Sequence, residues 1–297
     1  MRVAILGFGL IGGSIARALR LAPSAEAWRV VAWSPSGLGP AAAAHEGVVD
    51  AAAPDPEAAI AGADLVILAA PATEELELLD GLGGPWRAAL GRGAVVTDVA
   101  STKGAIAARA RSAGLRFVGG HPMAGREATG YAAATADLFA GRPWILVPGA
   151  TAGEAETAVV TELVRACGAR PVTMSPEAHD AAVAGISHLP LIASVALVEA
   201  VAGIGTTSAP DRPDWATTSA LSAGAWRDMT RIARGDPRMG AAIAATNAAA
   251  IAERLRAYRA VIDDWLAALE APGGPDEAAL AARLDAIRDR LESRADG

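Results

Sequence analysis

Four short segments of this 297-residue chain hold side chains that could do chemistry. They read TDVASTKG (97–104), GGHPMAGREATG (119–130), AGISHLPLIASVAL (184–197) and GAWRDMTRIARGDPRM (224–239). The second segment holds His121, one of only four histidines, placed after two glycines and before a proline. This setting, at the end of a short apolar run, predicts a backbone-defined loop in a ligand crevice rather than a histidine that fills the core.

The other polar residues of these segments also have purely structural explanations. Ser101 could cap the helix that follows it, and His188 could be a core histidine satisfied by hydrogen bonds. Arg227 and Arg231 are four residues apart and so share a helix face. There they could bind an anion, form a solvated stripe, or pair with Asp228 or Asp236. The sequence lacks H-x-x-H and C-x-x-C spacing and a nucleophile elbow, so we expect neither a metal site nor nucleophilic catalysis.

The start of the chain carries the glycine spacing of a dinucleotide site. An apolar run (2–6) is followed by Gly7, Gly9 and Gly12 in G-x-G-x-x-G spacing, and then by a helical pattern. Such glycines permit a tight turn, close approach of a pyrophosphate and close packing of the helix on the strand. Further cofactor-binding residues are expected in this loop and at later strand ends: Phe8, Leu10, Ile11, Ala70, Pro71, Asp98 and Lys103.

A series of apolar runs predicts the strands that must position these residues. They lie at 29–33, 64–70, 93–100, 116–120, 143–148 and 170–174, mostly separated by Ala-rich helical segments. This alternation predicts a parallel sheet covered on both faces, with ligands beyond the carboxyl ends of the strands.

After Met174 strand signals nearly vanish, and apolar residues follow helical spacing from 239 to 269 and again from 280 to 291. We therefore predict an α/β protein with a Rossmann-type dinucleotide-binding domain (1–172) followed by an all-helical domain (173–297). The helical domain would bind substrate and form a dimer.

The end of the second strand bears on the choice between NAD and NADP. A fold that prefers NAD usually places an acid about 20 residues past the glycines, to bind the ribose 2′-hydroxyl. This chain reads AWSPSG there, with hydroxyls at Ser34 and Ser36 and no acid. A simple turn around Pro35 is the alternative explanation. We lean towards NADP or use of both dinucleotides.

Composition excludes several classes of protein. The net charge of −7 and the pI near 5.2 argue against nucleic acid or an anionic membrane as partner. The single cysteine, Cys167, favours a buried structural thiol in a reducing cytoplasm. The most apolar later segment, 181–205, is interrupted by His188, Pro190 and Glu199 and does not resemble a membrane span. We expect a soluble cytoplasmic protein.

Taken in order, the segments GFGLIGGS, TDVASTKG, GGHPMAGRE..G, SHLP and WRDMTRIARGDPRM resemble the prephenate and arogenate dehydrogenases of tyrosine biosynthesis. The resemblance implies NAD(P)-dependent oxidative decarboxylation of prephenate to 4-hydroxyphenylpyruvate by a homodimer. Arogenate, or a related amino-substituted prephenate, is the alternative substrate.

The resemblance also implies roles for individual residues. His121 would accept the proton of the ring hydroxyl, with Ser101 beside it. Arg231 would hold a substrate carboxylate, and Glu127 would pair with or gate that arginine. The remaining substrate-binding candidates are His188, Arg126 and Arg227.

Three positions depart from the family pattern. Arg126 stands where the family commonly has Ser or Thr, Ala100 where it has glycine, and Ser34 where it has an acid. Arg126 puts the choice of substrate in question, and the other two affect the cofactor.

Two more distant interpretations stay open. A β-hydroxyacid dehydrogenase shares the glycine loop but needs a catalytic lysine in its second domain, and no lysine follows Lys103. A non-catalytic dinucleotide-binding sensor would keep the glycines without needing His121, Ser101 and Arg231 together.

Overall fold

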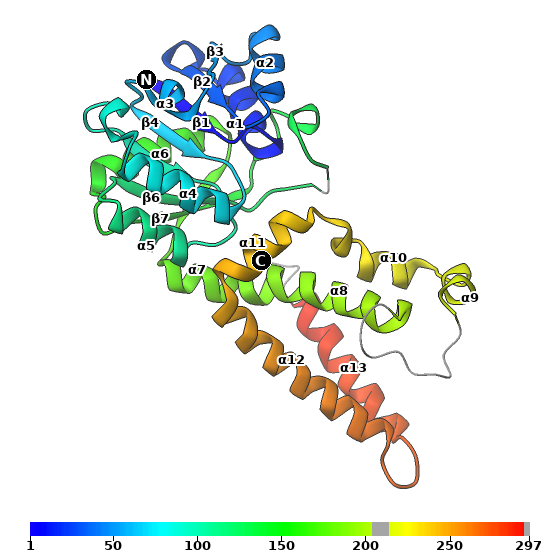
Figure 1. The fold of residues 1–297 in the computed structure, drawn as a ribbon. Coiled ribbons are helices and arrows are strands. Elements are labelled where there is room, and N and C mark those ends of the chain that lie inside the picture. Colours follow the sequence, from blue (N-terminus) through cyan, green and yellow to red (C-terminus); the bar gives the residue numbers. More distant parts are fainter. Residues whose placement is uncertain (127, 204–213, 294–297) are drawn as a thin grey trace. The chain divides into compact units, whose positions relative to one another are not determined.

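The computed structural model describes residues 1–126, 128–203 and 214–293 (Figure 1). By packing alone the chain separates into two compact units, Met1–Ile251 and Ala252–Gly297. The functional boundary at residue 172 stays a prediction from the sequence. Everything described below for the candidate site lies within the first unit.

The first unit is built on an eight-stranded sheet with the order β3-β2-β1-β4-β5-β6-β7-β8. The strands are β1 (Arg2–Leu6), β2 (Arg29–Trp33), β3 (Ala51–Ala52), β4 (Leu65–Leu68), β5 (Val95–Asp98), β6 (Phe117–Pro122), β7 (Pro143–Pro148) and β8 (Arg170–Thr173). All neighbours pair in parallel except β6 and β7, which are antiparallel. The predicted Rossmann-type sheet is confirmed, and the order reverses between β1 and β4, where such sheets bind ligands.

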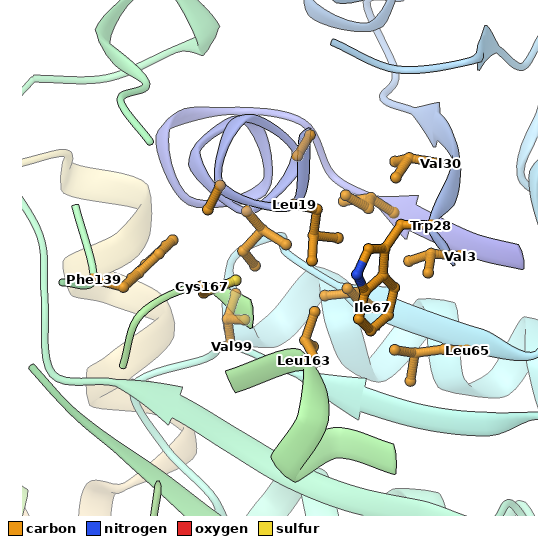
Figure 2. Close-up of a cluster of buried hydrophobic side chains, with 14 of the residues drawn as sticks. Val3, Leu19, Trp28, Val30, Leu65, Ile67, Val99, Phe139, Leu163 and Cys167 are labelled. Atoms are coloured by element: carbon orange, nitrogen blue, oxygen red, sulfur yellow. The ribbon is translucent and has the colours of Figure 1, made fainter. Parts of the chain in front are cut away.

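Helices cover both faces of this sheet. They are α1 (Leu10–Leu21), α2 (Leu38–His45), α3 (Pro56–Ile60), α4 (Ala72–Gly83), α5 (Gly104–Ser112) and α6 (Glu154–Ala166). One core cluster joins Leu19 of α1 and Leu163 of α6 to the sheet (Figure 2). On the other face of the sheet, a second core cluster includes Leu79 of α4 and Ile106 of α5. Cys167 lies in the first cluster, where burial raises the pKa of its thiol to about 12, as expected of a structural cysteine.

Three details differ from the sequence prediction. A parallel sheet was predicted, but β6 and β7 pair antiparallel. Strand β6 continues two residues further, to Pro122, because it pairs with β7; His121 therefore lies inside the strand, opposite Ile145. The two-residue strand β3 was not predicted, because its two alanines carry no pattern of β-branched or aromatic residues.

The chain after β8 is helical, as predicted. It forms α7 (Pro176–Val183), a π-helical turn η4 (Ala184–His188), α8 (Leu189–Ala202), α9 (Trp215–Ala220), α10 (Gly224–Thr230), α11 (Pro237–Thr246), α12 (Ala248–Leu269) and α13 (Glu277–Glu292). The apolar stripe that begins at Met239 is divided between α11 and α12, because Asn247 leaves the helical conformation with φ −128°.

The run Pro176–Ala202 is long and apolar enough to span a bilayer, with a mean hydropathy of 2.0 over its best window. Its buried polar side chains include His179, Asp180 and His188. All three make hydrogen bonds to residues of other segments. A helical run that packs in a folded domain and carries polar site residues accounts for both the apolar composition and the buried, hydrogen-bonded side chains.

Candidate active site

The glycine loop forms an open backbone cradle. Gly7 has φ +94°, which a residue with a side chain rarely adopts. A Cβ at Gly9 would meet nothing within 4 Å, so the backbone there is open to a ligand. Helix α1 begins at Leu10 with no side-chain cap and no acid in its first turn. Its N-terminal amides therefore fit the pyrophosphate of a dinucleotide.

Four further residues predicted to bind the cofactor lie just after β2 and β4. Ser34 is half-buried at the end of β2, and its carbonyl accepts a hydrogen bond from the Gly37 amide (3.0 Å). Ser36 is exposed, and its Oγ accepts from the Leu38 amide (3.4 Å). Helix α2 has no acid in its first turn. Ala70 and Pro71 follow β4 and are half-buried.

Asp98 and Lys103 form an ion pair whose two side chains are fully buried. The Asp98 carboxylate also accepts hydrogen bonds from the Gly120 amide (2.9 Å) and the Ala100 amide (3.1 Å). Both side chains are buried, and they fix the turn between β5 and α5. That they bind the cofactor stays a prediction from the sequence. Through Gly120 the pair also fixes the backbone immediately before His121.

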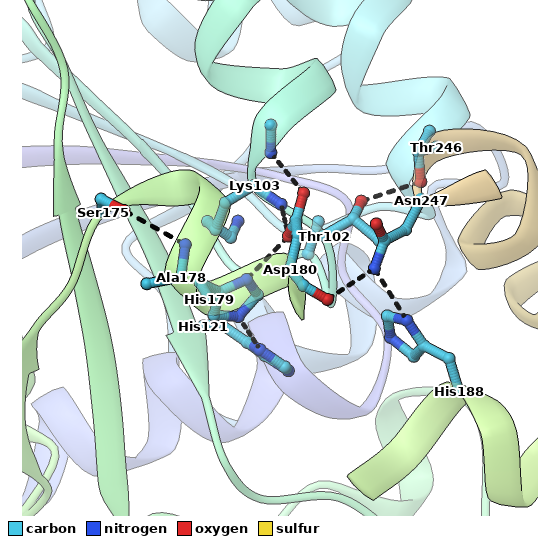
Figure 3. A network of polar contacts seen from close by, with 12 residues as sticks. Thr102, Lys103, His121, Ser175, Ala178, His179, Asp180, His188, Thr246 and Asn247 are labelled. Atoms are coloured by element: carbon cyan, nitrogen blue, oxygen red, sulfur yellow. Dashed lines mark hydrogen bonds and ion pairs between the residues drawn. The ribbon is translucent and has the colours of Figure 1, made fainter. Parts of the chain in front are cut away.

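His121 belongs to a chain of hydrogen-bonded side chains (Figure 3). Its Nδ1 lies 2.8 Å from Nε2 of His179, whose Nδ1 lies 2.8 Å from the Asp180 carboxylate. A carboxylate only accepts hydrogen bonds, so His179 carries its proton on Nδ1 and accepts at Nε2. His121 then donates from Nδ1, which leaves the lone pair on its Nε2. That tautomer is the one a general base requires.

Asp180 also binds the start of α5. Its two carboxylate oxygens accept hydrogen bonds from the backbone amides of Lys103 (2.7 Å) and Gly104 (2.8 Å). Burial raises the pKa of Asp180, but the hydrogen bonds from His179 and these amides outweigh it, so the pKa lies below its usual value. Ser101, which is half-buried in the same turn, does not cap α5, because the N-cap residue is Lys103.

His188 is fully buried at the end of the π-helical turn. The Asn247 side-chain amide donates to its Nδ1 (3.2 Å) and to the backbone carbonyl of Asp180 (3.0 Å). Nδ1 is thus the acceptor, and Nε2 carries the proton. Burial lowers the pKa of His188 to about 4, so it is a neutral hydrogen-bond donor at physiological pH.

His121 is also held neutral. Burial is the main cause that lowers its pKa well below the usual value, and the positive charge of Lys103 adds to it. In the part of the chain that the structure describes, no group of three His, Cys, Asp or Glu is placed to hold a metal ion.

The predicted arginines lie on exposed parts of the helical region and of the segment after β6. Arg227 lies in α10 and Arg231 is its C-cap residue; both are exposed. Arg126 is exposed, and its charge contributes to a lowered pKa of Asp137. Glu127 lies outside the described residues.

Sequence reasoning missed His179, Asp180 and Asn247, which orient the two predicted histidines. The adjacent His–Asp pair at the start of a helix was a visible signal, since two of the four histidines lie nine residues apart there. The π-helical turn η4, which ends at His188, changes how the two side chains are placed, and hydrophobic periodicity does not reveal it.

A Rossmann-type sheet with an open glycine loop and an imidazole oriented as a base defines a dinucleotide-dependent oxidoreductase. Comparison with protein families is more specific. The models of the nucleotide-binding domain and the dimerization domain of prephenate dehydrogenase match residues 15–173 and 175–281. The chain belongs to the prephenate dehydrogenase family, which confirms the resemblance seen in the sequence.

Individual relatives agree with this assignment. The chain is 32% identical to prephenate dehydrogenase of Bacillus subtilis (strain 168) over 267 residues, 89% of this chain and 67% of that protein. Its fold is similar to that of A. aeolicus prephenate dehydrogenase in complex with hydroxyphenyl propionate and NAD+ (TM-score 0.83, 27% identity, 98% of both chains). It is also similar to Synechocystis arogenate dehydrogenase (TM-score 0.77, 30% identity, 98% of this chain and 100% of that one).

Proposed function

We propose that this protein oxidises prephenate with NAD(P)+ to 4-hydroxyphenylpyruvate, carbon dioxide and NAD(P)H, in the cytoplasm. The observation that carries the proposal is the hydrogen-bonded chain from His121 Nδ1 through His179 to the Asp180 carboxylate, from which we infer a lone pair on His121 Nε2. Membership of the family supplies the substrate class.

The residues of this chain orient the substrate and accept its proton. A bound nicotinamide supplies the acceptor for the hydride that leaves the ring carbon bearing the hydroxyl. His121 takes the hydroxyl proton at Nε2 as that hydride leaves. The C–C bond to the carboxylate then breaks to release carbon dioxide, its electron pair enters the ring, and the ring oxygen takes the proton back from His121 to give 4-hydroxyphenylpyruvate. The positive charge that develops on His121 is stabilised through its Nδ1–H bond to His179 and the Asp180 carboxylate. Because the ring becomes aromatic, positioning is the main demand on the protein.

The other predicted site residues would bind the rest of the substrate. Arg231 holds one carboxylate by a bidentate pair, with Glu127 as its partner or gate and Arg227 nearby on α10. His188 donates from Nε2 to an oxygen of the substrate side chain, and Ser101 bonds the ring hydroxyl or the His121 imidazole.

The choice between prephenate and arogenate depends on local charge. Prephenate is a dianion without an amine, whereas arogenate carries an ammonium group. Arg126 is exposed, so its guanidinium would favour the dianion and repel an ammonium from the surface of the segment that follows β6. We therefore favour prephenate, with arogenate as the second candidate because of the likeness to Synechocystis arogenate dehydrogenase.

The cofactor preference is the second open choice. NAD(P) use follows from the nucleotide-binding domain, and we favour NADP or both dinucleotides. In support, the β2–α2 turn offers Ser34, Ser36 and the amides at the start of α2, with no acid in the first turn of that helix. An acid there would repel a 2′-phosphate.

We further propose a homodimer formed through the helical region, in keeping with the match to a dimerization domain. Several apolar side chains of this region are exposed in the single chain, which is typical of a subunit contact. They include Val195 of α8, Tyr258, Val261, Ile262 and Leu266 of α12, and Leu284, Ile287 and Leu291 of α13.

One experiment tests both choices. Reduced dinucleotide is followed by absorbance with prephenate or arogenate, each with NAD+ or NADP+, for the unmodified protein, Arg126→Ser and Ser34→Asp. We expect prephenate to be preferred, Arg126→Ser to narrow that preference, and Ser34→Asp to shift the protein towards NAD+. A preference for arogenate, or a ratio unchanged by Arg126→Ser, contradicts the substrate proposal. A strong preference for NAD+ in the unmodified protein contradicts the cofactor proposal.

A further inference from the structure

Lys103 is the only lysine of the chain, in which every other strongly basic side chain is an arginine. It is fully buried, and its ammonium group forms the ion pair with Asp98 on β5. Its stem runs beside β6, where a Cβ at Gly119 would lie 3.1 Å from Lys103 Cδ. A lysine carries a compact charge on a slender stem, whereas the planar guanidinium of arginine needs several acceptors. This narrow, buried position therefore suits the one lysine and not the common arginine.

Lys103 reaches His121 by two routes. Its ammonium group binds Asp98, whose carboxylate accepts a hydrogen bond from the backbone amide that precedes His121 (2.9 Å). Its own backbone amide donates to Asp180 (2.7 Å), which holds the His121 ring through His179 (Figure 3). One residue thus contacts both carboxylates that hold the candidate base.

The positive charge of Lys103 also acts on the His121 ring. Burial is the largest cause of the lowered pKa of His121, and the charge of Lys103 is the second. His179 and His188, which lie on the helical side of the site, contribute less. Lys103 is therefore the charged group that most disfavours protonation of the candidate base.

Two buried acids act on the Lys103 side chain from neighbouring elements, besides Asp180 at its amide. Asp98 on β5 is its ion-pair partner. Glu75 on α4 lies near both members of the pair, and burial, followed by the charge of Asp98, raises its pKa well above the usual value. Because Glu75 is then neutral near pH 7, Asp98 alone balances the ammonium charge among these acids.

We propose that Lys103 is a positioning residue for the candidate base, whose ammonium group anchors the backbone of His121 and acts on the charge of its ring. This inference rests on the proposed function. A nearby cation disfavours the protonated imidazole, so His121 waits in its neutral form and returns the proton to the ring oxygen once carbon dioxide has left. That Lys103 binds the cofactor is a separate prediction, and the same experiment distinguishes the two roles.

The experiment measures kcat/KM for prephenate as a function of pH, together with the Kd of NAD+ and NADP+ by calorimetry. Activity is lost on the acid side as the base of the free enzyme becomes protonated. Lys103→Met keeps the stem and removes the charge, so the pKa of His121 should rise. The acid limb of the profile should therefore move to higher pH by about one unit or more. The Kd of the dinucleotide should stay unchanged.

A second variant is needed because Lys103→Met leaves the Asp98 carboxylate buried without its partner. Asp98→Asn combined with Lys103→Met removes both charges but keeps an acceptor for the amide that precedes His121. Its acid limb should also move to higher pH, by less than in the single variant, because no carboxylate charge remains. Arg109→Met is the matched control, since it removes a cation of α5 whose ion pair with Asp80 is exposed. Its pH profile should equal that of the unmodified protein.

Nuclear magnetic resonance gives a readout that needs neither turnover nor a variant of Lys103. With isotope-labelled lysine the protein has a single lysine signal, and with labelled histidine the His121 signal is identified by its loss in His121→Asn. The lysine signal should shift at the pH where His121 titrates, because the two charges act on each other, and this shift should be absent in His121→Asn.

The outcomes separate the possible roles of Lys103. A lysine signal indifferent to the titration of His121, or an unchanged acid limb in a folded variant, overturns the inference. An unchanged acid limb with a weakened Kd for the dinucleotide also overturns it and assigns Lys103 to the cofactor. An unmodified protein that does not oxidise prephenate contradicts the proposed function, while the titration of the two signals still tests the action of Lys103 on His121.

Discussion

His121 is held from its backbone and from its ring. Asp98 accepts from the amide of Gly120, and Asp180 acts on the ring through His179. Both carboxylates also bind the turn between β5 and α5, Asp98 through Lys103 and Asp180 through two amides at the start of α5. One turn thus sets the place and the tautomer of the candidate base.

This arrangement predicts a large effect from a change that does not touch the substrate. The amide of Asp180→Asn can donate as well as accept, so His179 no longer has to carry its proton on Nδ1. The tautomer of His121 is then no longer fixed. We expect kcat to fall by about 10²-fold or more, with KM little changed. Asp55→Asn, which replaces the helix-capping carboxylate of α3, is the control and should keep kcat. A normal kcat in Asp180→Asn would show that the His179–Asp180 pair does not act on His121.

At the residue scale the sequence identified the side chains that belong to recognisable motifs. His121 stood out by its glycine and proline neighbours, and His188 by its place before an apolar helix. Asn247 could not be found in this way, because its partners, Asp180 and His188, are 67 and 59 residues away in the chain. Only the folded structure shows that Asn247, at the break between α11 and α12, fixes the tautomer of His188.

At the scale of elements, α4 carries an unusual buried acid. Glu75 is fully buried, and neither of its carboxylate oxygens has a hydrogen-bond partner among the described residues. Burial raises its pKa well above the usual value, and the nearby charge of Asp98 raises it further. The folded protein therefore keeps this proton at pH values where the unfolded chain has lost it.

Stability should accordingly depend on pH in a defined direction. Above the unfolded pKa of about 4.3, the folded state binds more protons than the unfolded state, so the free energy of unfolding falls as pH rises towards the folded pKa. Glu75→Gln removes this contribution, and its stability relative to the unmodified protein should increase by up to about 1.4 kcal/mol per pH unit. Urea unfolding at pH 5, 7 and 9 measures this, with the exposed Glu77→Gln as control. A difference that stays constant or shrinks with pH contradicts a protonated Glu75.

The strands were predicted from runs of Val, Ile and Leu, and these runs also determine the buried sheet. The antiparallel direction of β7 was not predicted. A parallel return usually needs a helical crossover. In the connection from residue 123 to 142, the residues that the structure describes form no helix other than the short η3. The absence of a helical pattern in that stretch of sequence was the available signal.

At the scale of the whole molecule, the helical region leaves apolar side chains exposed that an isolated chain does not cover. Ile262 of α12 and Ile287 of α13 are 41% and 60% exposed. The sequence predicted amphipathic helices here, but one chain cannot show whether the apolar stripe faces its own core or a second subunit.

We expect the protein to be a dimer in solution. Light scattering should give about twice the chain mass of 29.8 kDa. The double variant Ile262→Glu and Ile287→Glu should shift the mass to that of a monomer, because it places charges in a desolvated contact. Glu253→Lys replaces one charged side chain on α12 by another and is the control for an effect of surface charge. A monomeric unmodified protein would contradict the homodimer.

The central claim is that His121 is the base of a dinucleotide-dependent oxidation of prephenate. Its most direct test is the kcat of His121→Asn with prephenate and NAD(P)+, compared with the kcat of the unmodified protein. Binding of the dinucleotide alone to both proteins is the control. We predict that the variant folds and binds dinucleotide normally but turns over about 10²–10⁴-fold more slowly, the usual range for loss of a positioned general base. Turnover equal to that of the unmodified protein would show that His121 is structural and that the base lies elsewhere.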